Sequence, residues 1–363
     1  MRRLGISLYP EHSTPEADDA YMALASNYGF SRIFTCLLSV DKSPEETVAE
    51  FSQFMDRAHG YGFTVAVDTN PRVFQHLGAT ATDISVFAKM GVDIIRLDGH
   101  LGDRQDIALT RNPYGIAVEF NASQMLSLDL LIERGAYRRN MCVCHNFYPQ
   151  RFSGLSEKRF IEFSEYYFGM GLTQAAFVTS QQDKTFGPWP VYDGLPTCED
   201  DRTRSIDLQA RHLLATGLID DIMIGNCFAS EEELATLAAV DTTKVTFKVE
   251  FDSGATEVEK NVLYQFNHVT RGDASEYYLR SSVPRMFEYS TSIPARERTD
   301  CHIKRGDVLV VNDNLSHYLG EVEVALRDFE DDGTRNVVGR IPEDELFLLD
   351  YVKPEFPFGF VRD

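Results

Sequence analysis

The sequence predicts a (β/α)8 barrel followed by a smaller, mainly β domain. Eight short apolar runs occupy roughly the first 240 of the 363 residues, and an amphipathic stretch lies in nearly every gap between them. After Val240 the long amphipathic stretches stop, and short apolar runs alternate with turn signals such as Asp252-Ser253-Gly254. We therefore expect a barrel over residues 1–240 and a β domain over residues 241–363. The alternative for the first part is a doubly wound sheet, but no Gly-x-Gly-x-x-Gly motif follows the first run.

The barrel strands are predicted from apolar runs of five or six residues. In chain order they are Leu4–Tyr9, Arg32–Leu37, Phe63–Asp68, Ile94–Asp98, Gly115–Phe120, Met141–His145, Gln174–Thr179 and Asp221–Gly225. The helices predicted between and after them are Pro15–Tyr28, Pro44–His59, Thr82–Met90, Ser123–Arg134, Ser156–Gly169, Arg202–Thr216 and Ser230–Ala238. Several of these helices begin with Ser, Thr or Pro followed by acidic residues, which favour a helix N-terminus.

Two connections depart from this regular pattern. Gly102–Pro113 carries only a weak helical pattern, and Ser180–Asp201 is the longest stretch with no pattern at all. The second stretch contains Phe186, Tyr192 and the only tryptophan, Trp189. Long unpatterned loops in compact domains are usually functional or disordered, and the aromatic content argues against disorder. We expect this loop to cover the active face of the barrel; the alternative is that Trp189 packs against the second domain.

The second domain is predicted from a change of pattern. Its expected strands are Thr243–Glu250, Glu276–Arg280, Asp307–Val311 and Glu321–Leu326, and they are separated by Gly- and Asp-containing turns. No long helical pattern is found in this part of the sequence. A mainly β domain of about 120 residues follows from these features.

Composition excludes several classes of partner. The chain has 35 Lys and Arg against 56 Asp and Glu, a net charge of −21, and no basic run breaks this acidity. We therefore expect neither a nucleic-acid nor a membrane partner. The start of the chain does not resemble a signal peptide, and its six cysteines form no framework, so we expect reduced thiols and a cytoplasmic location. The oligomeric state is left open, with a homo-oligomer among the options.

Polar side chains are expected to meet at one end of the barrel. Active sites of these barrels lie at the C-terminal ends of the strands, and side chains alternate between the interior and the helices. On each strand the small and polar set is the better choice for the interior. The residues directed to the mouth in this way are Tyr9, Asp68, Arg96, Asp98, Glu119, Asn121, Asn146 and Asn226.

Three carboxylates, several amides and aromatic rings together favour a sugar ligand. Carboxylates serve as acid, base or nucleophile, and amides bind hydroxyl groups. The structural alternative is that Asp68 and Asp98 cap loops while Glu119 pairs with Arg96 inside the barrel.

Other chemistries find weaker support. By the alternation of side chains along its strand, His145 is expected to face the helices rather than the barrel interior. We interpret it as a buried histidine with its hydrogen bonds satisfied. Cys142 and Cys144 are interpreted as small packing residues rather than nucleophiles. No strand ends in a lysine suitable for Schiff-base chemistry, and Lys184 in the long loop is the nearest substitute. No set of histidines is spaced for zinc, so no metal or other cofactor is predicted.

Several motifs together resemble one bacterial family. In the barrel they are GISLYPE over 5–11, FTCLL over 34–38, RLD over 96–98 and CHNFYP over 144–149; in the second domain they are RSS over 280–282 and KRGD over 304–307. These motifs are similar to the family known as domain of unknown function 871, which contains the 6-phospho-N-acetylmuramidases of glycoside hydrolase family 170. The resemblance spans essentially the whole chain, and one departure from it is Gln150, directly after CHNFYP.

The resemblance implies a cytoplasmic enzyme that needs no metal. Its substrate would be a phosphorylated amino-sugar disaccharide of recycled peptidoglycan, cut between N-acetylmuramic acid 6-phosphate (MurNAc-6-phosphate) and N-acetylglucosamine (GlcNAc). It also implies a barrel followed by a cyclophilin-like β domain. The alternatives are a phosphosugar lyase or isomerase with one carboxylate as proton shuttle, and a sugar-binding protein without turnover.

The catalytic carboxylates are chosen only from the alternation of side chains along the predicted strands. Asp98 and Glu119 lie on neighbouring strands about 4.8 Å apart, which suits the roughly 5–5.5 Å separation of a retaining pair. We expect Glu119 to be the acid and Asp98 the nucleophile or the group that orients the substrate's own acetamide, with Asp68 and Glu11 as reserves. The residues expected to bind substrate are Tyr9, Glu11, Arg96, Asn121, Asn146, Tyr148, Arg151, Trp189, Asn226, Arg271, Arg280 and Arg285.

A dianionic phosphate needs local cations in so acidic a protein. Arg96 and Arg151 are available at the barrel mouth, and Arg271, Arg280 and Arg285 in the second domain. We expect the second domain to fold over the mouth and lend at least one arginine to the phosphate. The alternative is that these arginines pair with the domain's own acids, among them Asp273 and Glu276.

Overall fold

The computed structural model describes residues 2–39, 41–287, 289–297 and 302–362. The chain divides into two compact units, Met1–Val240 and Asp241–Asp363.

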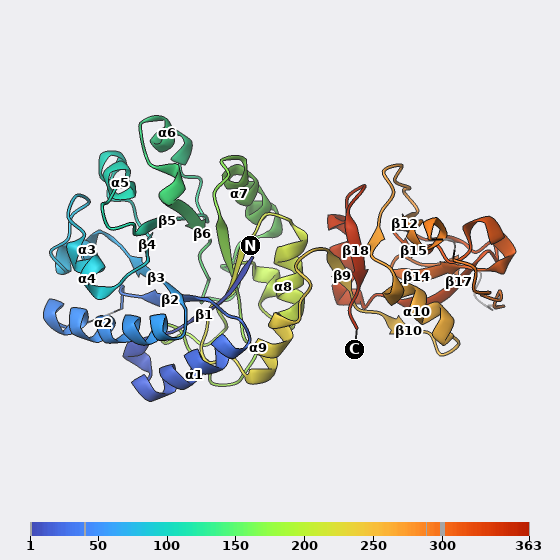
Figure 1. Cartoon of the computed structure of the whole chain (residues 1–363), viewed down its shortest axis with the longest axis horizontal. Helices are drawn as coiled ribbons and strands as arrows, with labels where there is room; N and C mark the ends of the chain where they lie inside the picture. The colour runs from blue at the N-terminus through green and yellow to red at the C-terminus, as the bar shows by residue number, and fades with distance from the viewer. Residues whose placement is uncertain (1, 40, 288, 298–301, 363) are drawn as a thin grey trace. The chain divides into compact units, whose positions relative to one another are not determined.

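The first unit is a closed barrel of eight parallel strands ringed by helices (Figure 1). The strands pair in sequence order, and β1 closes the barrel against β8. They are β1 (Arg3–Ser7), β2 (Arg32–Cys36), β3 (Thr64–Thr69), β4 (Ile94–Leu97), β5 (Ala117–Asn121), β6 (Met141–Cys144), β7 (Gln174–Val178) and β8 (Asp221–Ile224). The predicted barrel is confirmed, with each strand within two residues of its expected bounds.

Nine α-helices and three short 3₁₀-helices connect and follow these strands in the described part of the unit. The α-helices are α1 (Pro15–Asn27), α2 (Pro44–Gly60), α3 (Pro71–His76), α4 (Ser85–Met90), α5 (Asp103–Thr110), α6 (Leu128–Glu133), α7 (Glu157–Gly169), α8 (Ile206–Ala215) and α9 (Glu231–Ala238). The 3₁₀-helices are η1 (Pro10–His12), η2 (Arg138–Asn140) and η3 (Glu199–Asp201). The weak pattern after β4 therefore does form a helix, α5.

Helix starts follow the local signals in the sequence. Ser43 and Ser230 form full capping boxes with Glu46 and Glu233, which satisfies backbone N–H groups at the starts of α2 and α9. The predicted helix from residue 82 begins only at Ser85, because Thr80 and Asp83 hydrogen-bond to each other's backbone and hold a tight turn before it. The helix expected from residue 123 likewise begins later, at residue 128.

Alternation along the strands separates the barrel interior from the helix-facing core. Ile95, Val118 and Val143 are fully buried members of the core cluster. On the interior side, β1 presents Gly5, where a Cβ atom would lie 2.3 Å from the sulfur of Met223 on β8. Only glycine fits there without displacing this neighbour. On β2 to β5 the interior positions carry buried charged side chains, which are Arg32, Asp68, Arg96 and Glu119.

The second unit is mainly β. Its largest sheet has five strands in the order β10-β17-β14-β15-β12, and a three-stranded sheet has the order β11-β18-β9. The strands are β9 (Val245–Phe247), β10 (Glu250–Phe251), β11 (His268–Val269), β12 (Tyr278–Ser281), β13 (His302–Ile303), β14 (Asp307–Val311), β15 (Val322–Ala325), β16 (Phe329–Glu330), β17 (Arg335–Arg340) and β18 (Pro357–Phe360). The helices are α10 (Glu257–Gln265), α11 (Val283–Met286), η4 (Asp313–Tyr318) and η5 (Glu343–Tyr351).

Helix α10, nine residues long, was not among the predicted elements, because the sequence shows no long helical pattern in this unit. Thr256 and Glu259 form a capping box at its start, and the buried Glu259 also accepts a hydrogen bond from Asn336. Its apolar positions, Val262 and Leu263, are buried. The helix is short and follows a turn-rich segment, which is why the pattern was missed. The cyclophilin-like fold implied for this unit stays a prediction.

None of the helices in the described residues is long and apolar enough to cross a membrane.

Candidate active site at the barrel mouth

A buried ion-pair network fills part of the barrel interior. Arg32 on β2 contacts the Glu119 carboxylate and donates to Asp221 Oδ2 on β8 at 2.5 Å. Arg3 donates to both oxygens of the same Asp221 at 2.9 and 2.6 Å. Glu119 is fully buried. In the structural alternative Glu119 pairs with Arg96; in the structure Arg32, for which no role was predicted, takes that place.

A second polar group lies around Arg96 on β4. Its guanidinium contacts the carboxylate of Asp68 on β3 and the amide oxygen of Asn146. Asp98, just past the end of β4, has an oxygen 3.7 Å from the same guanidinium. Three predicted mouth residues, Asp68, Asp98 and Asn146, thus converge on one arginine.

The two carboxylates of this group differ in environment. Asp68 is 4% exposed, and burial raises its pKa to about 6, although Arg96 opposes the shift. The side chain of Asp98 is 42% exposed. A buried carboxyl with a raised pKa beside an exposed carboxylate is a pattern that separates acid and base roles in glycosidases.

Asp98 lines an open cavity of about 260 Å³. Its other side chains with chemistry are His100, Asn121 and Gln124, from the segments that follow β4 and β5. The amide oxygen of Asn121 accepts from the backbone N–H of Ser123, whereas its amide nitrogen is buried without a partner among the described residues. A buried amide donor without a partner costs free energy, so a ligand that accepts its hydrogen bond would be favoured.

His100 is held at this cavity by a buried carboxylate. Its Nδ1 lies 2.7 Å from Asp106 Oδ2, and Asp106 Oδ1 accepts from the Leu101 backbone N–H at 3.2 Å. The hydrogen bond to Asp106 raises the pKa of His100. The sequence reasoning missed His100; its position two residues after Asp98, past a strand end, was the available signal.

Two other residues predicted at the mouth, Tyr9 and Asn226, form hydrogen bonds within the protein. The hydroxyl of Tyr9, which is fully buried, donates to the Gly225 carbonyl at 2.6 Å. The amide oxygen of Asn226 accepts a hydrogen bond from the Ser180 N–H, and its amide nitrogen donates to Thr185 Oγ1, both at 2.8 Å. Asn226 thus fixes the start of the long loop, because the chain reverses there and offers it backbone partners.

Two further predicted binders lie near the mouth. Glu11 contacts the Ser39 hydroxyl with one oxygen, and its other oxygen is buried without a partner among the described residues. Tyr148 is partly buried, and burial raises the pKa of its hydroxyl. Glu11 therefore has hydrogen-bonding capacity left for a ligand.

The long loop packs on the barrel's aromatic residues. The Trp189 ring lies 6.0 Å from that of Phe147, which in turn contacts Phe34 and Phe177 at 5.7 and 5.1 Å. Trp189 remains 37% exposed. It thus combines a contact with its own unit and a free surface.

The remaining aromatic and basic residues of this region have separate environments. Phe186 stacks edge-on with Phe228, and Tyr192 is exposed. Arg151 pairs with Asp193 at 2.9 Å on the surface.

One arginine ties the loops after β6 and β7 together. Arg202 donates to the carbonyls of Tyr148 and Asp193 at 2.9 and 3.0 Å and pairs with Glu199. Glu199 accepts the backbone N–H of Phe152 at 2.7 Å, and the hydrogen bond from Arg202 lowers its pKa to about 2. We call Arg202 and Glu199 the loop clamp.

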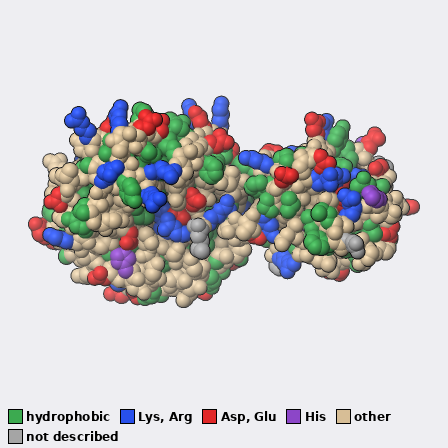
Figure 2. Space-filling model, turned by 45° about the horizontal axis from the view of Figure 1, so that its top comes forward, with side chains coloured by type: hydrophobic (Ala, Val, Ile, Leu, Met, Phe, Trp, Pro, Cys, Tyr) green, Lys and Arg blue, Asp and Glu red, His purple; other side chains and the backbone are tan. Residues whose placement is uncertain are grey.

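The second-unit arginines pair with acids of their own unit. Arg271 forms two hydrogen bonds with Asp273, at 2.6 and 2.8 Å, and Arg285 pairs with Glu321 at 2.7 Å. The nearest carboxylate oxygens to Arg280 belong to the same two acids, at 3.8 and 3.9 Å. Both signs of charge occur on the visible face of each unit (Figure 2).

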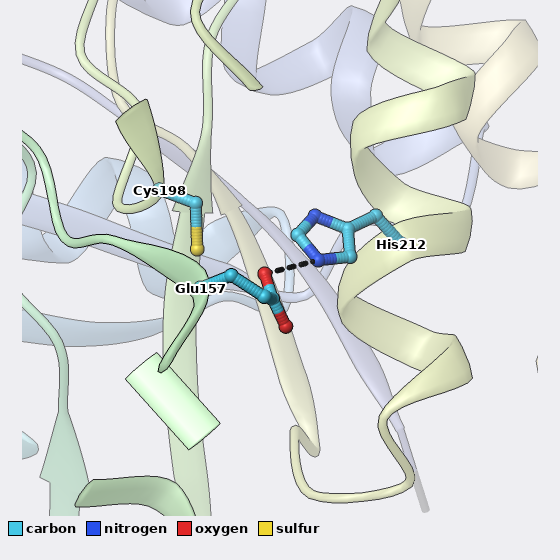
Figure 3. Close-up of side chains that lie close together, drawn as sticks. All are labelled: Glu157, Cys198 and His212. Atoms are coloured by element: carbon cyan, nitrogen blue, oxygen red, sulfur yellow. Dashed lines mark hydrogen bonds and ion pairs between the residues drawn. The ribbon is translucent and has the colours of Figure 1, made fainter. Parts of the chain in front are cut away.

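Across the described part of the chain, one group of side chains could hold a metal ion. It consists of Glu157, Cys198 and His212, whose ligand atoms lie within 4.8 Å of one another (Figure 3). His212 already contacts Glu157 through Nε2 at 2.8 Å and Asp201 through Nδ1 at 2.9 Å. Burial alone would lower the pKa of His212, but these carboxylates raise it to about 9. A metal ion would have to displace the contact with Glu157.

His145 and the two cysteines of β6 have the environments that the sequence reasoning described. His145 is fully buried, its Nε2 lies 2.9 Å from the Ser164 hydroxyl, and burial lowers its pKa to about 3. Burial raises the thiol pKa of both Cys142 and Cys144, which disfavours the thiolate that a nucleophile needs.

Comparison with known proteins identifies the family. Profiles of the 6-phospho-N-acetylmuramidase family match residues 4–239 for the N-terminal part and 245–361 for the C-terminal part. The solved structure of an uncharacterized B. cereus protein is 43% identical, covers 99% of both chains and superposes with a TM-score of 0.90. A conserved Enterococcus faecalis protein of unknown function is 24% identical over 99% of this chain and 96% of its own, with a TM-score of 0.70. No curated protein matches. The chain therefore belongs to the 6-phospho-N-acetylmuramidase family, as the resemblance in its motifs predicts.

Proposed function

We propose that the chain is a cytoplasmic glycoside hydrolase that cleaves MurNAc-6-phosphate from GlcNAc in peptidoglycan recycling. The family supports the reaction class. The observation that carries the proposal to this chain is that Asp98, which lines a cavity with an unpaired amide donor, shares the guanidinium of Arg96 with the buried Asp68. The cavity offers the Asp98 carboxylate for chemistry and the amides of Asn121 and Gln124 for sugar hydroxyls.

We assign the acid role to Asp68 and the anionic role to Asp98. With a pKa near 6, Asp68 keeps a proton over part of the neutral range and can donate it to the glycosidic oxygen as the bond to the anomeric carbon breaks. The exposed Asp98 either attacks that carbon or orients the acetamide oxygen of the substrate to attack it. Water then adds to the anomeric carbon and displaces Asp98 or the acetamide oxygen, while the Asp68 carboxylate takes up the water's proton and regains its acid form.

Strand alternation favours Glu119 as the catalytic acid, but this assignment does not give it that role. It is fully buried and ion-paired with Arg32. Unlike Asp68, it does not share its arginine with Asp98, the carboxylate that lines the cavity. Its proposed role is to keep Arg32 neutralised inside the barrel.

Incubation of the purified chain with the MurNAc-6-phosphate–GlcNAc disaccharide tests the proposal. Release of free GlcNAc supports it, and Asp98→Asn provides the matched inactive control. An unsaturated or isomerised sugar product would support the lyase or isomerase alternative, and binding without turnover the sugar-binding one. An N-trifluoroacetyl substrate, with a weaker acetamide nucleophile, would slow the substrate-assisted route and spare direct attack by Asp98.

A further inference from the structure

The second unit contains a basic cavity of about 190 Å³. Three cationic side chains line it, Arg271, Arg280 and Lys353, against one carboxylate, Asp273. The chain as a whole carries −21, so an excess of cations in one hollow runs against the overall composition. Its volume is below the roughly 300–1,000 Å³ of pockets for drug-sized ligands, which suits a small ionic group.

The cations of this cavity keep unused hydrogen-bond donors. Arg280 is about one-quarter exposed, and its nearest carboxylate oxygens, at 3.8 and 3.9 Å, lie beyond hydrogen-bonding distance. The ammonium group of Lys353 has no ion pair or hydrogen bond within the described ranges. Arg271 uses Nε and Nη2 on Asp273, which leaves Nη1 available.

The backbone holds these residues at fixed positions. The Arg271 N–H donates to the Arg280 carbonyl at 3.2 Å, so the two arginines sit on paired backbone. Thr270 donates through its hydroxyl to the Lys353 carbonyl at 2.7 Å, which ties the third cation to the same segment. Fixed backbone positions limit the conformational entropy lost on binding to that of the side chains.

We propose that this cavity binds a phosphate monoester dianion. A guanidinium offers paired donors that match phosphate oxygens, and a lysine adds a point charge. Among the five arginines expected to contact phosphate, Arg271 and Arg280 belong to this cavity, whereas Arg96, Arg151 and Arg285 contact acids elsewhere. Lys353 is an addition that the sequence reasoning did not include.

The phosphate has two possible sources. One is the 6-phosphate of the substrate, an assignment that rests on the proposed function. The other is a separate phosphorylated sugar or free phosphate bound by the second unit. The binding site itself does not depend on turnover, so the two ideas fail separately.

The direct test is isothermal titration calorimetry of the full chain with inorganic phosphate at fixed ionic strength. Arg280→Met and Lys353→Met should each weaken binding on the order of tenfold. Arg327→Met is the matched control, because it removes one charge from an exposed arginine of the same unit that does not line the cavity. Equal phosphate affinity in Arg280→Met, Lys353→Met and the unmodified chain would overturn the proposal.

A second arm separates the two sources. kcat/KM is measured for the Arg280→Met variant on the 6-phosphorylated disaccharide and on its unphosphorylated counterpart. A loss confined to the phosphorylated substrate assigns the cavity to the substrate's phosphate. Weakened phosphate binding with kcat/KM unchanged on both substrates assigns it to a separate phosphorylated ligand.

Discussion

Two charged groups lie in the barrel, and they differ in what surrounds them. Around Arg32, the carboxylates of Glu119 and Asp221 are fully buried and meet cations. Around Arg96, the buried Asp68 is joined by the exposed Asp98 beside an open cavity. Both groups use the same side-chain chemistry. Access to solvent and to a ligand, rather than residue type, is what separates a structural network from a candidate catalytic one.

The largest expected effect comes from the Arg96 group. Asp98→Asn and Asp68→Asn keep the shape of the side chain and remove its charge or transferable proton. We expect kcat to fall by about 10²- to 10⁴-fold, because general acid–base catalysis contributes on that scale. Tm should change little in Asp98→Asn, whose side chain is exposed, and should fall in Asp68→Asn, which also removes a buried partner of Arg96. Steady-state kinetics and thermal unfolding measure both, and Asp103→Asn, an exposed acid paired with Arg134, is the control. Near-native rates in both variants would refute the assignment.

The Arg32 group should respond in stability. Glu119→Gln leaves a buried guanidinium with less compensation, and breaking a buried ion pair costs about 3–5 kcal/mol. Denaturant unfolding measures the loss, and Glu162→Gln, in an exposed pair with Arg159, should cost less than about 1 kcal/mol. A Glu119→Gln protein of normal stability but without activity would restore Glu119 as the catalytic acid.

The pH dependence should sharpen the same contrast. The acid role requires protonated Asp68, whose pKa is raised to about 6. kcat/KM should therefore fall as the pH rises through about 6, since the proton is then lost before substrate binds. In the Asp68→Asn variant the residual activity should lose this alkaline limb. If the limb persists there unchanged, another group carries it.

His100 should have a smaller effect. Its imidazole, oriented by Asp106, faces the cavity that Asp98 lines. We expect His100→Asn to lower kcat/KM on the order of tenfold, the scale of one hydrogen bond to a charged group. His76→Asn, a histidine at the end of α3, is the control. An unchanged kcat/KM would remove His100 from the site.

Trp189 should report binding with the smallest change. It packs on Phe147 and keeps an exposed face, so a ligand at the mouth would alter its surroundings. Its intrinsic fluorescence should shift on titration with the 6-phosphorylated disaccharide, measured in Asp98→Asn to prevent turnover. Phe147→Leu should reduce the shift. No response at saturation would mean that the loop does not contact the ligand.

The sequence predicted the barrel and the Arg96 group because both depend on regular alternation. Parity on β3, β4 and the end of β6 was enough to bring Asp68, Arg96 and Asn146 together. It was not enough for Glu119, because alternation shows which side chains face the interior but not how far along the barrel axis each one lies. We call this position along the axis its level. The level depends on strand register, which the sequence does not state.

Loop residues were harder to predict for a different reason. Asn226 has the composition of a sugar ligand, yet its partners are backbone atoms of Ser180 and a hydroxyl of Thr185. Its role depends on the path of a loop about 45 residues earlier in the chain, which periodicity does not encode. His100 was missed because it lies beyond the last residue that strand parity covers.

The loop clamp determines which changes the loops after β6 and β7 can tolerate. Arg202 and Glu199 hold carbonyl and N–H groups of residues 148–154 and 193–194, so their partners are mainly backbone atoms. Side chains on the two loops can therefore be exchanged without loss of the anchor. Insertions or deletions inside the clamped segments would move its partners out of reach. Point substitutions on these two loops should accordingly be tolerated better than changes in their length.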